Sequence, residues 1–312
     1  MKHDEYVDVS VVLPVFNERE HLEEELTRLR AVLDAAPFTW EVVAVDDGST
    51  DGSDRVLAEC DWIRLVTFRR NQGVGTARRI GSLVSRGRAI VWTDADLSYP
   101  NDEIPRLVKL LEDADQVIGA RRKERGTMRV LRWSAKRVAR GLAGYLVNQK
   151  IPDLNSGLRA FRREALLPYL PLLPKGFSCV STATLAFIAD GRPVRFEAVD
   201  YHPRAGLSKF HPIHDAYLFL LQIIGISMYH NPLRAFVPLA VTMFTLAFAK
   251  LGFDFAVHPW RVATNTILIF SAAFQVAVLG LVADLVVRTR SWPRAVGPTL
   301  PVVREPTAPP NQ

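Results

Sequence analysis

Two aspartates placed one residue apart are the side chains of this 312-residue chain with the clearest capacity for chemistry. Asp94 and Asp96 follow directly on the apolar run Ala89–Trp92. Side chains alternate along a strand, so both carboxylates would project to the same side. Two like charges this close repel each other unless a positive charge lies between them. A hard divalent cation with oxygen ligands meets that need and commonly bridges to phosphates, whereas an acidic turn that merely closes a strand is the alternative.

Five apolar runs before residue 121 predict the strands that would position these carboxylates. Their continuous hydrophobicity is typical of a parallel sheet covered on both faces. Between the first two runs, leucines at helical spacing would share one face of a helix. Strands that alternate with helices indicate a doubly wound α/β domain. The predicted strands are Val9–Phe16, Trp40–Val45, Ile63–Phe68, Ala89–Thr93 and Gln116–Ala120, and the leucines are Leu22, Leu26, Leu29 and Leu33.

Polar residues stand at the end of every predicted strand. Ligands of such sheets bind at the carboxyl ends of the strands, where these residues would gather. The sequence therefore predicts a ligand site at this edge of the sheet, formed by Asn17-Glu18, Asp46-Asp47, Arg69–Asn71, Asp94–Asp96 and Arg121-Arg122.

The apolar residues are unevenly spread and predict a membrane segment. They make up 48% of the chain beside 23% charged residues, and they concentrate after residue 235. Two segments, about 233–253 and 262–287, are each near the roughly 20 residues that span a bilayer. The short connection between them predicts a helical hairpin. Arginines flank its outer ends, so the positive-inside rule places both termini and the α/β domain in the cytoplasm, at the cell membrane; they are Arg234, Arg288, Arg290 and Arg294.

The remaining segments complete the predicted organisation. Residues 208–231 are amphipathic and aromatic, which predicts a helix lying on the membrane surface, with an ordinary buried helix as the alternative. Residues 291–312 are rich in proline and lack periodicity, which predicts a disordered tail. The α/β domain would cover 1–207 and the hairpin region 232–290. Cys60 and Cys179 make neither a disulfide framework nor a zinc cluster, which favours a reducing compartment, and the polar first residues predict no signal peptide.

Four segments in order resemble the family-two glycosyltransferases of the GT-A fold. They are Val12–Glu18, Val45–Asp51, Asn71–Gly75 with Ala77 and Arg79, and Asp94–Pro100. Three later segments are similar to the polyprenyl-phosphate branch of that family, the dolichol-phosphate mannose synthases and bactoprenol glucosyltransferases. These segments are Gly119–Arg121, Asp153–Arg159 and His202–Lys209. The fold that the resemblance implies is a Rossmann-like, mostly parallel sheet, followed here by the predicted hairpin.

The resemblance also implies an activity. It is the inverting transfer of one sugar from a GDP- or UDP-linked donor to a polyprenyl phosphate, which could be undecaprenyl, decaprenyl or dolichyl phosphate. The implied cofactor is Mg²⁺ or Mn²⁺, and membrane lipids are implied partners. The implied metal ligands are Asp94, Asp96 and Ser98, the last standing where the family often has Gln. The implied nucleotide-sugar contacts are Pro14, Phe16, Glu18, Val45, Asp46, Asp47 and Asp94, with Asp46 and Asp47 as alternatives for the base and ribose.

The remaining implied roles concern catalysis and the acceptor. Catalysis is assigned to Asp96, Arg121, Asp153 and Arg159, and binding of the acceptor phosphate to Arg132, Ser156, Arg204 and Lys209. Guanidinium groups suit phosphate oxygens because they bind in a bidentate manner. Asp153 has two alternative roles, as a group that orients or deprotonates the acceptor, or as a cap of the loop at Asn155–Gly157.

Other function classes fit the sequence less well. A processive polysaccharide synthase usually carries Gln-x-x-Arg-Trp, and here Val130 stands three residues before Trp133. A non-catalytic membrane adaptor would not need the intact acidic motifs. The net charge of +6 suits anionic lipids and phosphorylated substrates, and no nucleic-acid reader motif accompanies it. The sugar, the base, the polyprenol length and assembly into a homo-oligomer stay open.

Overall fold

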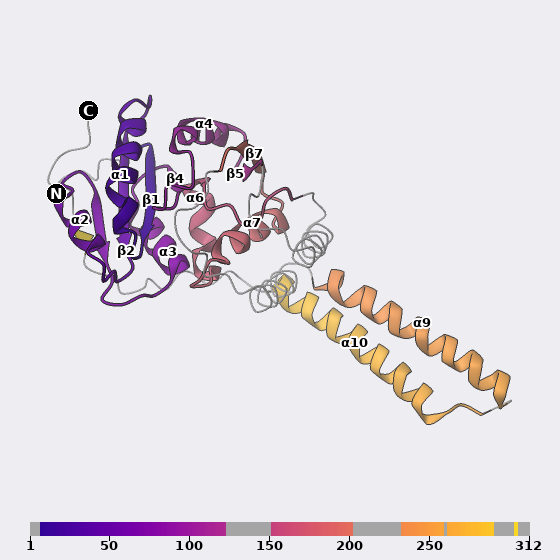
Figure 1. The fold of residues 1–312 in the computed structure, drawn as a ribbon. Helices are drawn as coiled ribbons and strands as arrows, with labels where there is room; N and C mark the ends of the chain where they lie inside the picture. Colours follow the sequence, from indigo (N-terminus) through magenta and orange to yellow (C-terminus); the bar gives the residue numbers. More distant parts are fainter. Residues whose placement is uncertain (1–6, 123–150, 202–231, 259–260, 290–302, 305–312) are drawn as a thin grey trace.

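The computed structural model describes residues 7–122, 151–201, 232–258, 261–289 and 303–304, and shows an α/β domain from which a two-helix hairpin extends (Figure 1). The predicted surface helix at 208–231 lies outside the described residues, as does the predicted tail except for 303–304. Both remain predictions.

The described residues form one eight-stranded sheet in the order β7-β5-β6-β4-β1-β2-β3-β8. Strands β4, β1, β2 and β3 are parallel to one another, and β7 is parallel to β5. This confirms the mostly parallel sheet. The bounds are β1 Val9–Val15, β2 Trp40–Asp46, β3 Arg64–Thr67, β4 Ala89–Trp92, β5 Gln116–Arg121, β6 Arg159–Arg162, β7 Val194–Val199 and β8 Val303–Arg304.

Three of these strands were not predicted. Strand β6 inserts between β4 and β5 and is antiparallel to both, so the first four predicted strands are separated from the fifth. Strand β7 adds beyond β5. Strand β8 lies in the segment predicted as disordered, and that prediction is wrong for Val303 and Arg304, which pair with β3.

Helices cover both faces of the sheet. The predicted leucine face of α1 (Arg19–Asp34) packs on one face with Val9, Val11 and Leu13 of β1. Val12, which points the other way, packs with α7 (Cys179–Ala189) and Trp92. Helix α3 (Val74–Val84) lies on this second face against β2 and β3. The short helices are α2 (Ser53–Glu59), α4 (Ile104–Lys109) and α6 (Arg163–Leu166), with 3₁₀ segments at Asn101–Glu103, Leu110–Glu112 and Leu167–Leu172.

The hairpin consists of α9 (Leu233–Val257) and α10 (Thr264–Thr289), both long and apolar enough to cross a membrane. Its buried small or polar residues repeat every seven positions on each helix, the spacing of a left-handed seam. They are Ala240, Ala247 and Asp254 on α9 and Thr266, Ala273 and Gly280 on α10. A side chain at Gly280 would approach the Cβ of Phe236 to 2.6 Å. Small residues therefore let the two helices approach closely, while the bulky apolar side chains face outward.

A charged cluster closes the far end of this seam. The Asp254 carboxylate accepts hydrogen bonds from the Ala263 amide at 3.1 Å and from the Thr266 hydroxyl, and it pairs with Lys250. It thereby satisfies donors at the start of α10 and holds both helices at the connection.

The first turn of α3 is fixed by a close backbone approach. The Gly75 amide donates a 2.7 Å hydrogen bond to the Lys175 carbonyl. A Cβ at Gly75 would overlap the Pro174 carbonyl oxygen and lie 2.9 Å from that of Gly176. Glycine at this position therefore lets the Pro174–Gly176 loop lock onto α3.

Gly75→Ala should therefore destabilise the α/β domain by about 1–3 kcal/mol, because backbone must move to admit the methyl group. The measurement is thermal unfolding of the purified full chain. Gly176→Ala is the matched control, since a Cβ there meets nothing within 4 Å. Equal melting temperatures for the two variants would contradict the account.

Candidate active site

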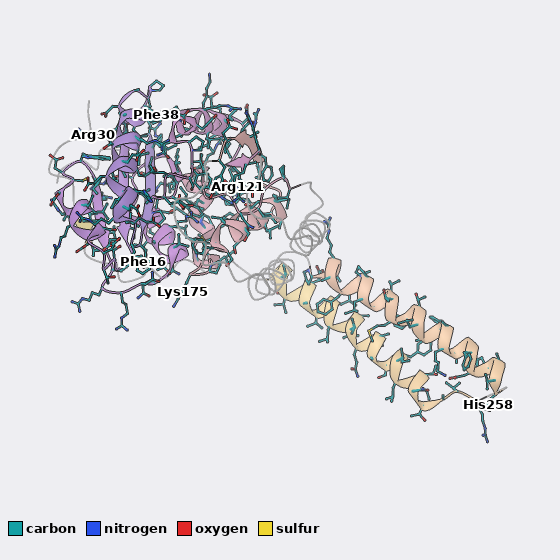
Figure 2. All side chains as sticks on the ribbon, in the orientation of Figure 1. Phe16, Arg30, Phe38, Arg121, Lys175 and His258 are labelled. Carbon is teal, nitrogen blue, oxygen red and sulfur yellow. The ribbon has the colours of Figure 1, made fainter. Side chains whose placement is uncertain are left out.

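The polar residues that follow β1, β2 and β4 meet at one edge of the sheet. The order β4-β1-β2 makes these strands neighbours, and the register pairs Val15 with Asp46. Figure 2 shows Phe16, just after β1, at the end of the domain opposite to Phe38, which precedes β2. The structure thus brings the predicted acidic and aromatic residues together at the carboxyl edge.

Hydrogen bonds join the turn after β1 to the loop after β2. The Thr50 amide donates to the Asn17 side-chain oxygen at 2.8 Å, and the Asn17 and Glu18 amides donate to the hydroxyls of Ser49 and Ser53 at 3.1 and 3.0 Å. Asn17 adopts a left-handed backbone with φ of 56°, which an Asn tolerates better than most residues. Phe16 and Glu18 are partly exposed at this mouth, while Pro14 and Val45 are buried in their strands.

The two neighbouring carboxylates at the end of β2 have different roles. Both oxygens of Asp47 accept backbone hydrogen bonds, from Gln72 at 2.7 Å and Gly73 at 2.8 Å. Asp47 therefore holds the β3–α3 loop in place. Asp46 accepts one bond, from the Ser49 amide at 3.0 Å, and in the described part of the chain this leaves its second oxygen for a ligand. Of the two alternatives for base or ribose binding, the geometry favours Asp46.

Arg78 of α3 is a site residue that the sequence interpretation missed. Its guanidinium donates to Asp94 at 2.5 Å, lies 5.6 Å from the Trp92 ring centre and reaches the Cys179 sulfur at 3.5 Å. Its side chain is only 2% exposed. The available signal was its position among the small residues Gly75, Ala77, Gly81 and Ser82, which predict the part of the helix that packs closest to the sheet.

Asp96 is held by its own turn. The Ser98 amide, at 3.2 Å, and the Ser98 hydroxyl both donate to the same carboxylate oxygen of Asp96. Leu97 between them adopts a left-handed backbone with φ of 58°, which is a strained conformation for a leucine. Ser98 therefore orients Asp96 in this structure, a role that differs from direct ligation.

The donor set at this turn fits a divalent cation only in part. No group of three or more His, Cys, Asp or Glu residues within the described ranges is arranged to hold a metal. Asp94 and Asp96 supply two carboxylates, and Mg²⁺ is often bound through one or two carboxylates plus substrate phosphates and water. The residues therefore fit a cation whose coordination the substrate completes, and they do not form a cage made of protein alone.

Asp153 forms a bidentate ion pair with Arg121. The two guanidinium contacts measure 2.7 and 2.9 Å, and the Arg121 guanidinium lies 5.3 Å from the Tyr201 ring centre. Burial would raise the pKa of Asp153, but its hydrogen bonds and the Arg121 charge outweigh that effect and leave the pKa below its ordinary value. The Asn155 amide also donates to Asp153 at 2.9 Å. Of its two alternative roles, the contacts favour the loop cap, since a carboxylate with a low pKa is a weak base.

Arg159 and Ser156 lie inside the protein. The Arg159 guanidinium donates to the carbonyls of Leu154, Ser156 and Val180 and to the Thr184 hydroxyl, and the residue is fully buried. Burial, and then the neighbouring Arg78 charge, lower the pKa of Arg159 to about 9. The Ser156 hydroxyl donates to the Gly119 carbonyl at 2.5 Å. The predicted contacts of Arg159 with reacting groups and of Ser156 with the acceptor phosphate are therefore corrected, because these side chains shape the 154–157 loop.

That loop runs directly against the acidic turn. A Cβ at Gly157 would lie 2.5 Å from a carboxylate oxygen of Asp94, and the Gly157 amide donates to the Tyr99 hydroxyl at 2.6 Å. The loop that Arg159 supports therefore forms one wall of the Asp94 site. The remaining predicted phosphate ligands, Arg132, Arg204 and Lys209, lie outside the described residues.

Glu25 is a second residue that the sequence interpretation missed. It is 1% exposed on α1, accepts a 2.7 Å hydrogen bond from Asn101, and its other oxygen has no partner among the described residues. Asn101 in turn accepts from the Thr93 hydroxyl at 3.2 Å. Burial raises the pKa of Glu25 to about 7, and the charges of Asp96 and Asp94 add to the shift. A buried carboxyl with a pKa near neutrality thus lies behind the acidic turn.

Comparison with known families gives two matches. The family described as "Glycosyl transferase family 2" matches residues 10–169, and "GtrB C-terminal hairpin" matches residues 231–289. Together they cover the acidic edge of the sheet and both helices of the hairpin.

Curated relatives match about half of the chain. An undecaprenyl-phosphate 4-deoxy-4-formamido-L-arabinose transferase of Pseudomonas syringae pv. syringae is 34% identical over 195 residues, which are 57% of this chain and 56% of the relative. The Edwardsiella ictaluri protein of the same name is 33% identical over 184 residues, 54% of this chain and 56% of the relative. The chain thus spans about half the length of the curated relatives it matches.

Solved structures share the fold. Glucosyl-3-phosphoglycerate synthase from Mycobacterium tuberculosis, in complex with Mn²⁺, UDP-glucose and phosphoglyceric acid, is 21% identical with a TM-score of 0.55, covering 71% of this chain and 80% of that chain. At this identity the likeness concerns the fold alone.

Arg159→Lys should lower the stability of the chain by roughly 2–4 kcal/mol, because a lysine cannot reach all of the buried carbonyls and leaves some unpaired. Thermal unfolding is the measurement. Arg162→Lys, on the same strand with a side chain 40% exposed, is the control and should cost much less, since water can reach its carbonyl partners. A stable Arg159→Lys protein would refute the internal role.

Glu25→Gln should change how stability depends on pH. The pKa of Glu25 is ordinarily 4.5 and is about 7 in the folded chain. The contribution of this group to the free energy of unfolding is therefore fully present below pH 4.5 and is lost as the pH rises through 7. Relative to the parent, the free energy of unfolding of the variant should rise by up to about 3 kcal/mol between pH 5 and 8. The measurement is thermal unfolding across that range, with exposed Glu24→Gln as control. Parallel pH profiles for parent and Glu25→Gln would contradict the shift.

Proposed function

Since the chain belongs to glycosyl transferase family 2, we propose that it transfers a single sugar from a nucleotide sugar to a polyprenyl phosphate at a membrane surface. The observation that carries this proposal is the meeting of Asp46, Asp94 and Asp96 at one sheet edge, in a chain that also has a hairpin of membrane-spanning length. The carboxylates at the sheet edge suit the binding of a nucleotide diphosphate through a cation, and the hairpin suits an acceptor that is linked to a lipid.

The donor would bind at the mouth formed by the ends of β1 and β2. Phe16 and Glu18 are partly exposed there, and Asp46 has a carboxylate oxygen available to a base N–H or a ribose hydroxyl. Asp47 contributes indirectly, by fixing the backbone at Gln72 and Gly73. Both GDP- and UDP-linked donors suit this arrangement.

The metal would be Mg²⁺ or Mn²⁺, held by Asp94 and Asp96 with Ser98 orienting the second carboxylate. When bound, such a cation stabilises the negative charge that develops on the departing diphosphate. Arg78 adds a fixed positive charge beside Asp94 and prevents the two carboxylates from repelling each other in the free protein.

The acceptor needs little activation. A phosphate monoester is already an anion at neutral pH, so an in-line attack on the anomeric carbon requires orientation more than proton removal, and it would invert that centre. This agrees with the ion-paired state of Asp153, which makes it a poor base. Arg132, Arg204 and Lys209 remain proposed ligands of the acceptor phosphate. The undecaprenyl-phosphate transferases among the relatives support this class of acceptor.

The hairpin would anchor the enzyme with its catalytic domain in the cytoplasm. Arg234 lies at the start of α9, and Arg288 lies near the end of α10, with Arg290 and Arg294 following in the sequence. The positive-inside rule favours the cytoplasmic side for both ends. The Lys250–Asp254 pair compensates the charges near the opposite end.

Asp96→Asn should abolish transfer, with a fall of at least about 10²-fold, because one of the two carboxylates for the cation is lost. The assay follows radiolabelled sugar from UDP- and GDP-linked donors into a single-sugar lipid extracted with organic solvent, using undecaprenyl or decaprenyl phosphate and Mn²⁺. Asp54→Asn, an exposed residue of α2, is the control. Undiminished transfer by Asp96→Asn would refute the metal assignment, and a polymeric product would refute single-sugar transfer.

A further inference from the structure

The outer edge of β3 is occupied by a strand from the far end of the chain. Strand β8 pairs antiparallel with β3, with Val303 opposite Val66 and Arg304 opposite Leu65. Both β3 residues are buried, and without β8 the strand would present an apolar edge with unpaired backbone groups. Such edges are normally protected because they pair with other chains.

A side-chain contact adds to this pairing. The Arg304 guanidinium donates a 2.6 Å hydrogen bond to the Ala58 carbonyl. Ala58 lies in the last turn of α2, where carbonyls lack helical partners and a positive charge is favourable. Arg304 therefore recognises a second element of the domain, independently of the sheet ladder.

The sequence around β8 limits its length. Val302, Val303, Arg304 and Glu305 stand between Pro301 and Pro306. Proline cannot donate a hydrogen bond to a ladder, so a strand at this place has at most four residues. A short β-prone segment bounded by prolines is suited to reversible pairing with one edge and is poorly suited to building a larger sheet.

The position of β8 makes this pairing a mechanical link. Figure 1 shows β8 beside α2, on the side of the domain away from the hairpin. The chain leaves the hairpin at Thr289 and reaches β8 at Val303, 14 residues later. That length spans at most about 50 Å even when fully extended. The same domain is joined to the hairpin a second time, through the segment that precedes Leu233.

We propose that the β3 edge is a docking site for the chain's own C-terminal segment, and that β8 is a tether that fixes the orientation of the catalytic domain relative to the hairpin. The hairpin is then linked to the domain twice, by the covalent chain between Tyr201 and Pro232 and by the hydrogen-bonded pairing of β8 with β3. Pairing in this form also requires both outer ends of the hairpin to lie on the same side of the membrane as the domain. The tether does not depend on which sugar or acceptor the enzyme uses.

The first experiment measures orientation with spin labels in the full chain in lipid nanodiscs. Labels are placed at exposed Glu24 on α1 and exposed Thr289 at the end of α10, in a Cys60→Ser background. The distance distribution should be narrow in the full chain and broad after deletion of residues 303–312. Deletion of residues 306–312, which keeps β8, is the matched control and should leave the distribution narrow. An unchanged distribution without β8 would overturn the tether.

The second experiment separates pairing within one chain from pairing between two copies. Hydrogen exchange of Arg64–Thr67 should be faster by about tenfold or more after deletion of residues 303–312, and unchanged after deletion of residues 306–312. Nanodiscs loaded with a single chain should keep the full protection. Loss of protection in single-chain discs would assign the strand to a second copy and overturn the proposal. Arg304→Ala should weaken protection partially, since it removes only the contact with Ala58.

Discussion

The ion pair between Arg78 and Asp94 is the interaction on which the site depends. Acidic groups gathered at one sheet edge would repel each other, and this buried guanidinium, on helix α3, compensates their charge. It also links three elements, since it reaches from α3 to the end of β4 and to Cys179 at the start of α7. The close approaches at Gly75 and Gly157, and the hold of Asp47 on the β3–α3 loop, keep these elements where the pair can form.

Arginines therefore divide into two groups in this chain. Arg78, Arg121 and Arg159 are paired or bonded internally and build the walls of the site. In the proposed function, the binding of substrate phosphates falls to Arg132, Arg204 and Lys209, which lie outside the described residues. Such a division keeps the buried charges constant while substrate charges enter and leave. It also explains why Asp153, fixed by Arg121, suits a mechanism that relies on orientation.

Much of the fold followed from the sequence, and less of the site. Continuous apolar runs predicted β1 to β5 because burial on both faces leaves a local pattern, and the seven-residue spacing of small residues lay within the predicted hairpin. Strand β6 was not predicted because Arg159–Arg162 has only two apolar residues. Its place in the sheet depends on non-local, antiparallel pairing. Residue types identified the acidic turn. They did not distinguish Asp46 from Asp47, or reveal the internal position of Arg159, because those roles depend on which backbone groups the fold brings near.

The close seam of α9 and α10 has a consequence for the lipid environment. Because Ala240, Ala247, Ala273 and Gly280 let the helices pack closely along their length, a tilt of one helix carries the other with it. Helix α9 has 25 residues and a length of about 38 Å, whereas a hydrocarbon layer is about 30 Å thick. Any apolar length in excess of this layer is accommodated by tilting the two helices together, by an amount that follows bilayer thickness. Membrane thickness would in this way influence the angle at which the carboxyl edge of the sheet faces the proposed lipid acceptor.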